Sequence, residues 1–149
     1  MVQFLAMLQK LSLKGIIVGA FLNVGGTIAW GVLEAFYFLL TNNLHSLPYT
    51  QQVSKLTSLM TDPSIVALNI VIGGGFSILG GYIAARIAKH DELLNATLSS
   101  FICILLALPT LGSASLQNIV LGIVANPLLS LLGGYLLVWQ IKKKRKAKR

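Results

Sequence analysis

The chain has 149 residues, of which 55% are hydrophobic and only 11% are charged, and its mean hydropathy is +0.78. A soluble domain usually carries about 25% charged residues, so this composition excludes an ordinary soluble protein and indicates one domain of several membrane-spanning helices. The net charge of +8 is concentrated in residues 142–149, which hold seven of the 12 Lys and Arg residues.

The first predicted elements are an interfacial segment and a long span. Residues 1–14 are apolar with Lys10 and Lys14 near their end, which favours a short helix at the membrane surface. A cleaved signal peptide is the alternative, but the apolar run that follows is too long for one. Residues 15–40 are predicted to cross the bilayer. Small or polar residues at every fourth position, here called a fourfold series, indicate a closely packed helix face in lipid, and this span carries Gly15, Gly19, Asn23, Thr27 and Gly31.

Glu34 is an acidic residue inside this predicted span. A carboxyl at membrane depth usually faces a partner or a water-filled cavity, so Glu34 is a candidate to bind a cation or basic ligand, or to change protonation during transport. Alternatively, it reaches water at the outer interface, or is held protonated by Thr27, Thr41 or a polar group of another span. Nearby aromatic residues are predicted to lie at the lipid headgroups: Trp30, Phe36, Tyr37 and Phe38.

Residues 41–62 are predicted to form the sizeable loop of the chain. Apolar residues at helical spacing, from Val53 to Met60, indicate a short surface helix within it. Asp62 followed by Pro63 is typical of an N-cap and the first residue of a helix, and so predicts the start of a second span at residues 63–88. Its fourfold series is Asn69, Gly73, Ser77, Gly81 and Ala85.

A short charged turn leads into two further predicted spans, 93–108 and 116–141. Asp91 is expected to cap the third span, and Pro109 to end it. The connection that follows is too short for anything but an antiparallel hairpin. Pro127 is expected to kink the fourth span or leave a carbonyl free. The fourfold series are Asn95, Ser99, Cys103 and Ala107 in the third span, and Asn118, Gly122, Asn126, Ser130 and Gly134 in the fourth.

The distribution of positive charge predicts the orientation. One side of the four-span arrangement collects eleven Lys and Arg residues, whereas the other has only Lys55. Both termini are therefore expected in the cytoplasm and the long loop outside. The basic tail, residues 142–149, is expected to contact anionic lipids through Lys142, Lys143, Lys144, Arg145 and Lys146. Nucleic-acid binding is not expected, because no base-stacking aromatic residues are interleaved with these charges.

Two segments of the chain align without a gap. Residues 77–89 read SILGGYIAARIAK, and residues 130–142 read SLLGGYLLVWQIK. One interpretation is a duplicated hairpin whose copies are related by an axis along the membrane normal. The alternative is that Gly-Gly-Tyr arose twice, because two helices ended with the same need for close packing and an interfacial aromatic residue.

One of these segments resembles a known signature. Gly80, Gly81, Tyr82, Ala84, Arg86 and Ala88 are similar to the G-G-Y-x-A-x-R-x-A pattern of small, uncharacterised prokaryotic membrane proteins with four spans. The resemblance implies a bacterial inner-membrane protein with four spans. It implies no activity and no catalytic residue.

The polar residues of the spans allow two interpretations. Asn23, Thr27, Asn69, Asn118 and Asn126 could line a polar path with Glu34, or they could make hydrogen bonds between helices. We expect no metal, because three consecutive residues such as 90–92 do not converge on one ion. No Ser, His and acid combination lies on one side, so an enzyme or a cofactor site is not expected. Helix packing is assigned to Gly73, Ser77, Gly81, Gly122, Ser130 and Gly134.

The sequence thus predicts an all-α integral-membrane bundle of four helices. The leading functional hypothesis is a non-enzymatic protein that acts through helix packing, as a homo-oligomer or as an accessory subunit of a larger membrane assembly. The alternative is a small transporter or channel whose polar path includes Glu34. A dry, fully packed interior would favour the first hypothesis, and a hydrated cavity that reaches Glu34 would favour the second.

Overall fold

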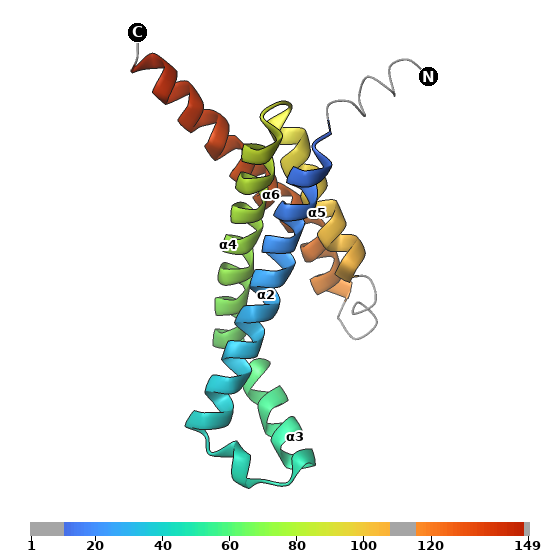
Figure 1. Ribbon diagram of the computed structural model, residues 1–149. Helices are drawn as coiled ribbons and strands as arrows, with labels where there is room; N and C mark the ends of the chain where they lie inside the picture. The colour runs from blue at the N-terminus through green and yellow to red at the C-terminus, as the bar shows by residue number, and fades with distance from the viewer. Residues whose placement is uncertain (1–10, 108–115, 148–149) are drawn as a thin grey trace.

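The computed structural model describes residues 11–107 and 116–147, and within these ranges the chain is helical and has no strands. The predicted all-α class is therefore confirmed. The interfacial segment falls largely, and the linker between the third and fourth spans entirely, outside the described residues. The elements in chain order are α2 (Leu13–Thr41), the 3-10 helix η1 (Leu44–Ser46), α3 (Tyr49–Met60), α4 (Pro63–Ala88), α5 (Glu92–Ala107) and α6 (Leu116–Lys146), as Figure 1 shows.

Three of these helices are long and apolar enough to cross a membrane. They are α2, α4 and the Gly122–Lys146 part of α6. The described part of the third predicted span, α5, has 16 residues, which correspond to about 24 Å of helix and fall just short of a typical span. The membrane character of the chain rests on the three long helices.

Local sequence sets the helix boundaries. The hydroxyl of Ser12 accepts a hydrogen bond of 3.2 Å from the backbone N–H of Gly15 at the start of α2. Asp62 caps α4 by accepting a 2.9 Å bond from the N–H of Ser64, and Pro63 occupies the first turn, as the sequence predicts. Hydrogen bonds from the Ser64 side chain and backbone hold the pKa of Asp62 below its usual value. Lys89 ends α4 in the left-handed conformation, with φ at 60°.

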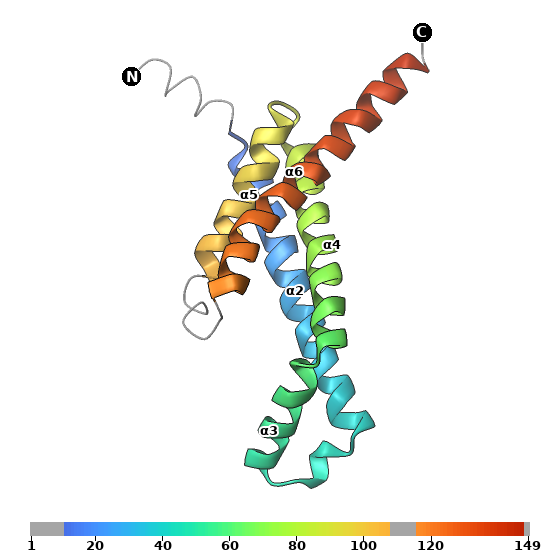
Figure 2. The same ribbon diagram turned by 180° about the vertical axis from the view of Figure 1, so that it is seen from behind.

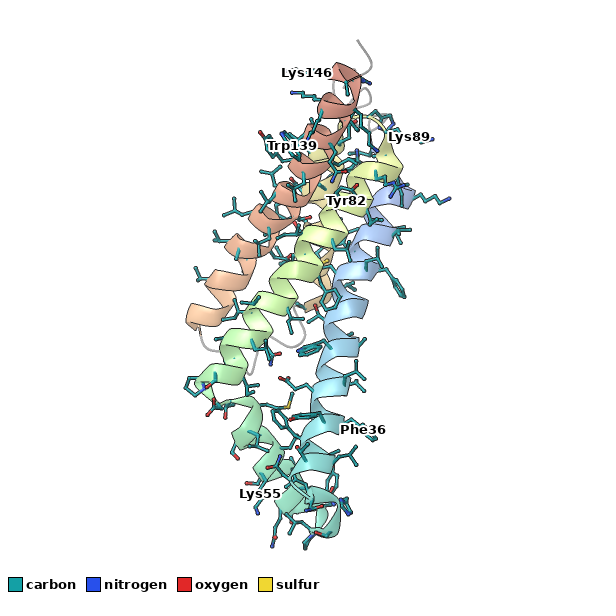
Figure 3. The ribbon with its side chains drawn as sticks, turned by 90° about the vertical axis from the view of Figure 1, so that its left-hand side faces the viewer. Phe36, Lys55, Tyr82, Lys89, Trp139 and Lys146 are labelled. Atoms are coloured by element: carbon teal, nitrogen blue, oxygen red, sulfur yellow. The ribbon has the colours of Figure 1, made fainter. Side chains whose placement is uncertain are left out.

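The two ends of the molecule differ in structure and charge. At the turn end, α2 begins, α4 ends and the α4–α5 turn lies, whereas η1, α3 and the last turns of α2 form the loop end and extend beyond the other helices (Figures 1 and 2). The predicted surface helix is confirmed as α3, in which no residue is buried. Lys89 and Lys146 lie toward the turn end, and Lys55 lies at the loop end (Figure 3).

The α6 helix continues further than the predicted span. It includes residues 142–146, which the sequence assigns to a basic tail, and its end projects away from the other helices (Figures 1 and 2). The ammonium of Lys143 lies 5.3 Å from the ring centroid of Trp139, a cation–π contact one turn away along the helix. The helix also continues through Pro127.

Helix α4 is the centre of the fold, because it packs against α2, α5 and α6. Adjacent glycines serve two neighbours at once. The position of an added Cβ at Gly80 would lie 2.6 Å from the carbonyl oxygen of Gly19 in α2, and one at Gly81 would collide with the backbone of Ser130 in α6. Small residues thus bring the helix backbones into direct contact.

Gly133 and Gly134 repeat this arrangement in α6. A Cβ at Gly133 would collide with the carbonyl of Ile78 in α4, and one at Gly134 would lie 2.8 Å from the Cβ of Ala96 in α5. The overall packing is less symmetric than a duplicated hairpin predicts. Among the described residues α4 packs on α5, whereas the corresponding pair, α2 and α6, makes few contacts. The duplication stays a prediction, and both Gly-Gly pairs have the same physical role.

Candidate functional site

Each fourfold series is packed over its turn-end half. In α2, Gly15, Gly19 and Asn23 are buried, and in α4 the same holds for Ser77, Gly81 and Ala85. Here serine side chains join the helices: the Ser130 hydroxyl donates 2.7 Å to the carbonyl of Ala96 and lies 3.3 Å from the hydroxyl of Ser99. Ser77, Gly81, Ser130 and Gly134, which the sequence assigns to packing, all lie in this half.

A junction of three polar side chains marks the limit of the packed half. The Asn23 amide in α2 donates a 3.0 Å hydrogen bond to Oδ1 of Asn126 in α6. The hydroxyl of Ser77 in α4 lies 3.4 Å from Oδ1 of Asn23. This Asn23–Ser77–Asn126 junction satisfies polar groups that would be costly to leave unpaired in an apolar interior.

Beyond the junction, toward the loop end, the fourfold series face open space. Apart from the adjacent residues and backbone of its own helix, no described atom lies within 4 Å of a Cβ placed at Gly31, Gly73 or Gly122. A cavity of about 400 Å³, here called the groove cavity, is instead lined by Gly73 and Gly122 together with Asn69 and Asn126. Gly73 and Gly122 therefore line a cavity within this chain, whereas the sequence assigns both to helix packing.

Glu34 is the most unusual side chain of this open half. Only 6% of its surface is exposed, although it carries a carboxyl group. The Asn69 amide donates a 2.9 Å hydrogen bond to Oε2 of Glu34, and the Asn69 Oδ1 accepts a 2.7 Å bond from the Trp30 indole. One asparagine of α4 thus fixes both a carboxyl and an aromatic ring of α2.

The second oxygen of this carboxyl has no such partner. Oε1 of Glu34 is buried and finds no hydrogen-bond partner among the residues that the structure describes. A buried acceptor without a donor costs about 1–3 kcal/mol, more when it is charged, so such atoms in native proteins call for an explanation. One explanation is that Oε1 accepts a hydrogen bond from a bound ligand. Another is that the carboxyl carries a proton, or that Oε1 accepts from a water molecule.

Two cavities adjoin the Glu34 side chain. The larger, about 370 Å³, is here called the aromatic cavity, and Trp30, Tyr37 and Phe38 line it with the apolar residues Leu33, Ile65 and Leu68. The smaller, about 240 Å³, lies toward Thr27, Asn69 and Gly73. Because Asn69 and Gly73 also line the groove cavity, the open spaces follow one face of α4 from Glu34 to Asn126.

The structure brings together most of the predicted polar residues but not all. Glu34 and Asn69 are in direct contact, and Asn23 and Asn126 are in direct contact. Thr27 is exposed on α2, where its hydroxyl donates to the carbonyl of Asn23 in its own helix. The side chain of Asn118 lies outside the described residues. The predicted lipid contacts Lys142, Lys143, Lys144, Arg145 and Lys146 are all exposed.

Trp30, Tyr37 and Phe38 are members of the site that the sequence does not assign to it. Their aromatic character predicts a position at the lipid headgroups, which stays a prediction; in the structure Phe38 is buried and all three line the cavity beside Glu34. A signal was present in the spacing. Trp30 and Phe38 each lie one helical turn from Glu34, so the three side chains share a face of α2.

The described residues contain no group of three His, Cys, Asp or Glu side chains that could hold a metal ion. Cys103 is buried, and its thiol lies 3.2 Å from the carbonyl of Ser99, in the packed half. The chain thus offers one candidate site in its described part, a buried carboxyl between two cavities.

No protein-family model, curated protein or solved structure matches the chain. The resemblance of Gly80–Ala88 to a prokaryotic signature therefore stays a prediction. What the site can do has to be judged from its own geometry: it offers a carboxyl group, an aromatic wall and open space.

Proposed function

We propose that this protein crosses the membrane four times, with both termini in the cytoplasm. Three long apolar helices support the membrane assignment. Helix α5 completes an even number of spans if its described 16 residues, with those that follow, cross a bilayer. Positive charge supports the orientation. In the described part of the chain, basic residues lie at the start of α2, at the end of α4 and at the end of α6, all toward the turn end, whereas Lys55 lies at the loop end.

Within this topology, we propose that the protein is a small carrier or channel whose polar path includes Glu34. The observation that carries the proposal is the buried carboxyl, with an oxygen lacking a described donor, beside cavities on both sides. A protein that acts only through helix packing needs neither a cavity between its helices nor an acidic side chain at membrane depth. The cavity that reaches Glu34 is the feature that distinguishes transport from packing alone.

The proposed path runs from the loop end along α4. It begins at the aromatic cavity, passes Glu34 and Asn69, and continues through the groove cavity to the Asn23–Ser77–Asn126 junction. There the tightly packed turn-end half closes it. In this proposal the structure represents a state closed toward the cytoplasm, and the hydrogen bonds of the junction are the contacts that would have to part.

Cysteine accessibility tests the path without knowledge of the solute. In a Cys103→Ala background, Gly73→Cys and Gly122→Cys each place a thiol in the groove cavity, where a Cβ meets no described atom. Val71→Cys is the matched control, because Val71 is 72% exposed on the outer face of α4. We expect a water-soluble, membrane-impermeant maleimide to label the two cavity positions and to leave Val71→Cys unlabelled. Equal resistance at all three positions would refute a hydrated path.

A second candidate function is assembly through helix packing. Its specific support is Gly75, which is exposed and has no described atom within 4 Å of a Cβ, as if a partner helix were to approach there. If a second copy packs at this position, Gly75→Leu will lower the oligomer mass measured by light scattering in mild detergent. The matched Val32→Leu, at an exposed position of α2 rather than α4, will not. An unchanged mass for Gly75→Leu would reject assembly at this face.

A further inference from the structure

We infer that the aromatic cavity beside Glu34 binds a lipophilic primary ammonium ion. The inference rests on the proposed function and names the class of solute that its site would take. Three features of the cavity support this class: the absence of basic residues from its wall, the missing donor at Glu34, and the aromatic rings around it.

The first feature is a carboxyl group without a basic partner. None of the described residues that line the aromatic cavity or the smaller cavity is Lys or Arg. The hydrogen bond that the Glu34 carboxyl accepts comes from the neutral amide of Asn69. A carboxylate at this depth is costly unless a cation or a proton accompanies it, so a bound cation is the complement that the lining lacks.

The second feature is the geometry of the carboxyl group. Oε2 of Glu34 is occupied by Asn69, whereas Oε1 is buried without a described donor. A primary ammonium group carries N–H bonds and can supply that donor in a charge-assisted hydrogen bond. A quaternary ammonium ion cannot donate, and a hydrated metal ion would leave the apolar part of the cavity unfilled.

The third feature is the apolar and aromatic lining. Trp30, Tyr37 and Phe38 offer π faces that attract a cation, and Leu33, Ile65 and Leu68 surround space for a hydrocarbon body. The Trp30 ring is held in place by its hydrogen bond to Asn69, the residue that also holds Glu34. A volume of about 370 Å³ is at the lower end for ligand pockets, so the ligand is small.

The test uses 2-phenylethylammonium as the probe and neutral 2-phenylethanol as its matched control. The full chain carries Trp139→Phe, which leaves Trp30 as the sole tryptophan, since the sequence has two. Each probe is titrated in mild detergent while Trp30 fluorescence is followed. We expect saturable binding of the ammonium ion and at least about tenfold weaker binding of the alcohol, because a charge-assisted hydrogen bond is lost.

Variants then assign the selectivity to one carboxyl. Glu34→Gln should weaken ammonium binding about tenfold or more and remove the preference over the alcohol, and Glu34→Asp should retain part of that preference. Glu92→Gln, the same change at the start of α5, should bind like the parent protein. Circular dichroism verifies that each variant is folded.

The outcomes separate the ligand class from the proposed path. Equal affinity for the two probes, absence of binding, or a preference that survives in Glu34→Gln would overturn the inference. The comparison of the two probes on the Trp139→Phe protein needs no change at Glu34, so it tests the inference even if Glu34→Gln fails to fold. Labelling of the Gly73→Cys and Gly122→Cys thiols is measured without either probe, and it decides separately whether a path exists.

Discussion

At the scale of single residues, Asn69 is the group on which the site depends. Its amide donates to the Glu34 carboxyl and its carbonyl oxygen accepts from the Trp30 indole, so one side chain of α4 satisfies two polar groups of α2. The same contacts explain why the series position of Asn69 is polar, whereas Gly73, the next member, is small. Asn69 makes hydrogen bonds to side chains of α2, whereas Gly73, which has no side chain, lines the groove cavity.

Removing Asn69 should therefore cost more than one interhelical hydrogen bond. We expect Asn69→Leu to lower the free energy of unfolding by about 1–2 kcal/mol, because Glu34 and Trp30 both lose a hydrogen-bond partner. In the double variant Glu34→Leu/Asn69→Leu, the loss should be smaller than the sum of the single losses by at least about 0.5 kcal/mol. Chemical unfolding in detergent measures the cycle, and additive losses would show that the two side chains do not interact.

At the scale of helices, the two Gly-Gly pairs explain how α4 and α6 each pack on two neighbours. Consecutive residues of a helix point in directions about 100° apart, so adjacent glycines open two faces. Gly80 meets α2 while Gly81 meets α6, and Gly133 meets α4 while Gly134 meets α5. Shared packing demands are therefore sufficient to account for both Gly-Gly-Tyr segments, whether or not they descend from one hairpin.

Two glycines of one series provide a matched pair for this account. Gly81→Ala should destabilise the protein by about 1–3 kcal/mol, because its methyl group would collide with the Ser130 backbone. Gly73→Ala should be neutral or stabilising by up to about 1 kcal/mol. The added methyl group meets no described atom of a neighbouring helix within 4 Å, and alanine has a higher helix propensity than glycine. Thermal unfolding in the same detergent compares them. Equal effects would contradict the division of α4 into a packed and an open half.

The sequence predicts where the helices of this protein begin and end much better than it predicts where neighbouring helices touch and where they separate. Periodicity and end signals such as Asp62-Pro63 locate the helices, since these are local properties. The fourfold series looks the same along its whole length, yet Gly81 is in contact and Gly73 borders a cavity. Where helices diverge depends on crossing angles set by all neighbours. The sequence therefore makes Glu34 and Asn69 candidates but does not predict their direct contact, which joins two helices, whereas the spacing within α2 does place Trp30 beside Glu34.

At the scale of the whole molecule, two differences between the ends point in the same direction. The turn end carries the described basic residues of α2, α4 and α6, while the loop end carries η1, α3 and Lys55 (Figure 3). The open half of the fourfold series faces the loop end, and the packed half faces the turn end. The charge distribution that sets topology and the packing that would close a path thus share one axis.

This common axis makes topology a test of the functional proposal as well as of the fold. Ser54 in α3 and His90 in the α4–α5 turn are both exposed, and replacing either leaves every Lys and Arg in place. In a Cys103→Ala background, we expect a membrane-impermeant maleimide to label Ser54→Cys in intact cells, and to label His90→Cys only after the membrane is permeabilised.

The reverse pattern would place the open half of the fourfold series toward the cytoplasm, because α3 precedes the loop-end start of α4 and the α4–α5 turn follows its other end. The path would then have to admit its solute from inside the cell, and the junction at Asn23, Ser77 and Asn126 would close it toward the outside. Labelling of both positions in intact cells would place both of them outside. It would therefore contradict a membrane crossing by α4, the helix of 26 residues that joins α3 to the turn. Only exclusive labelling of Ser54→Cys agrees with charge, helix length and cavity position together.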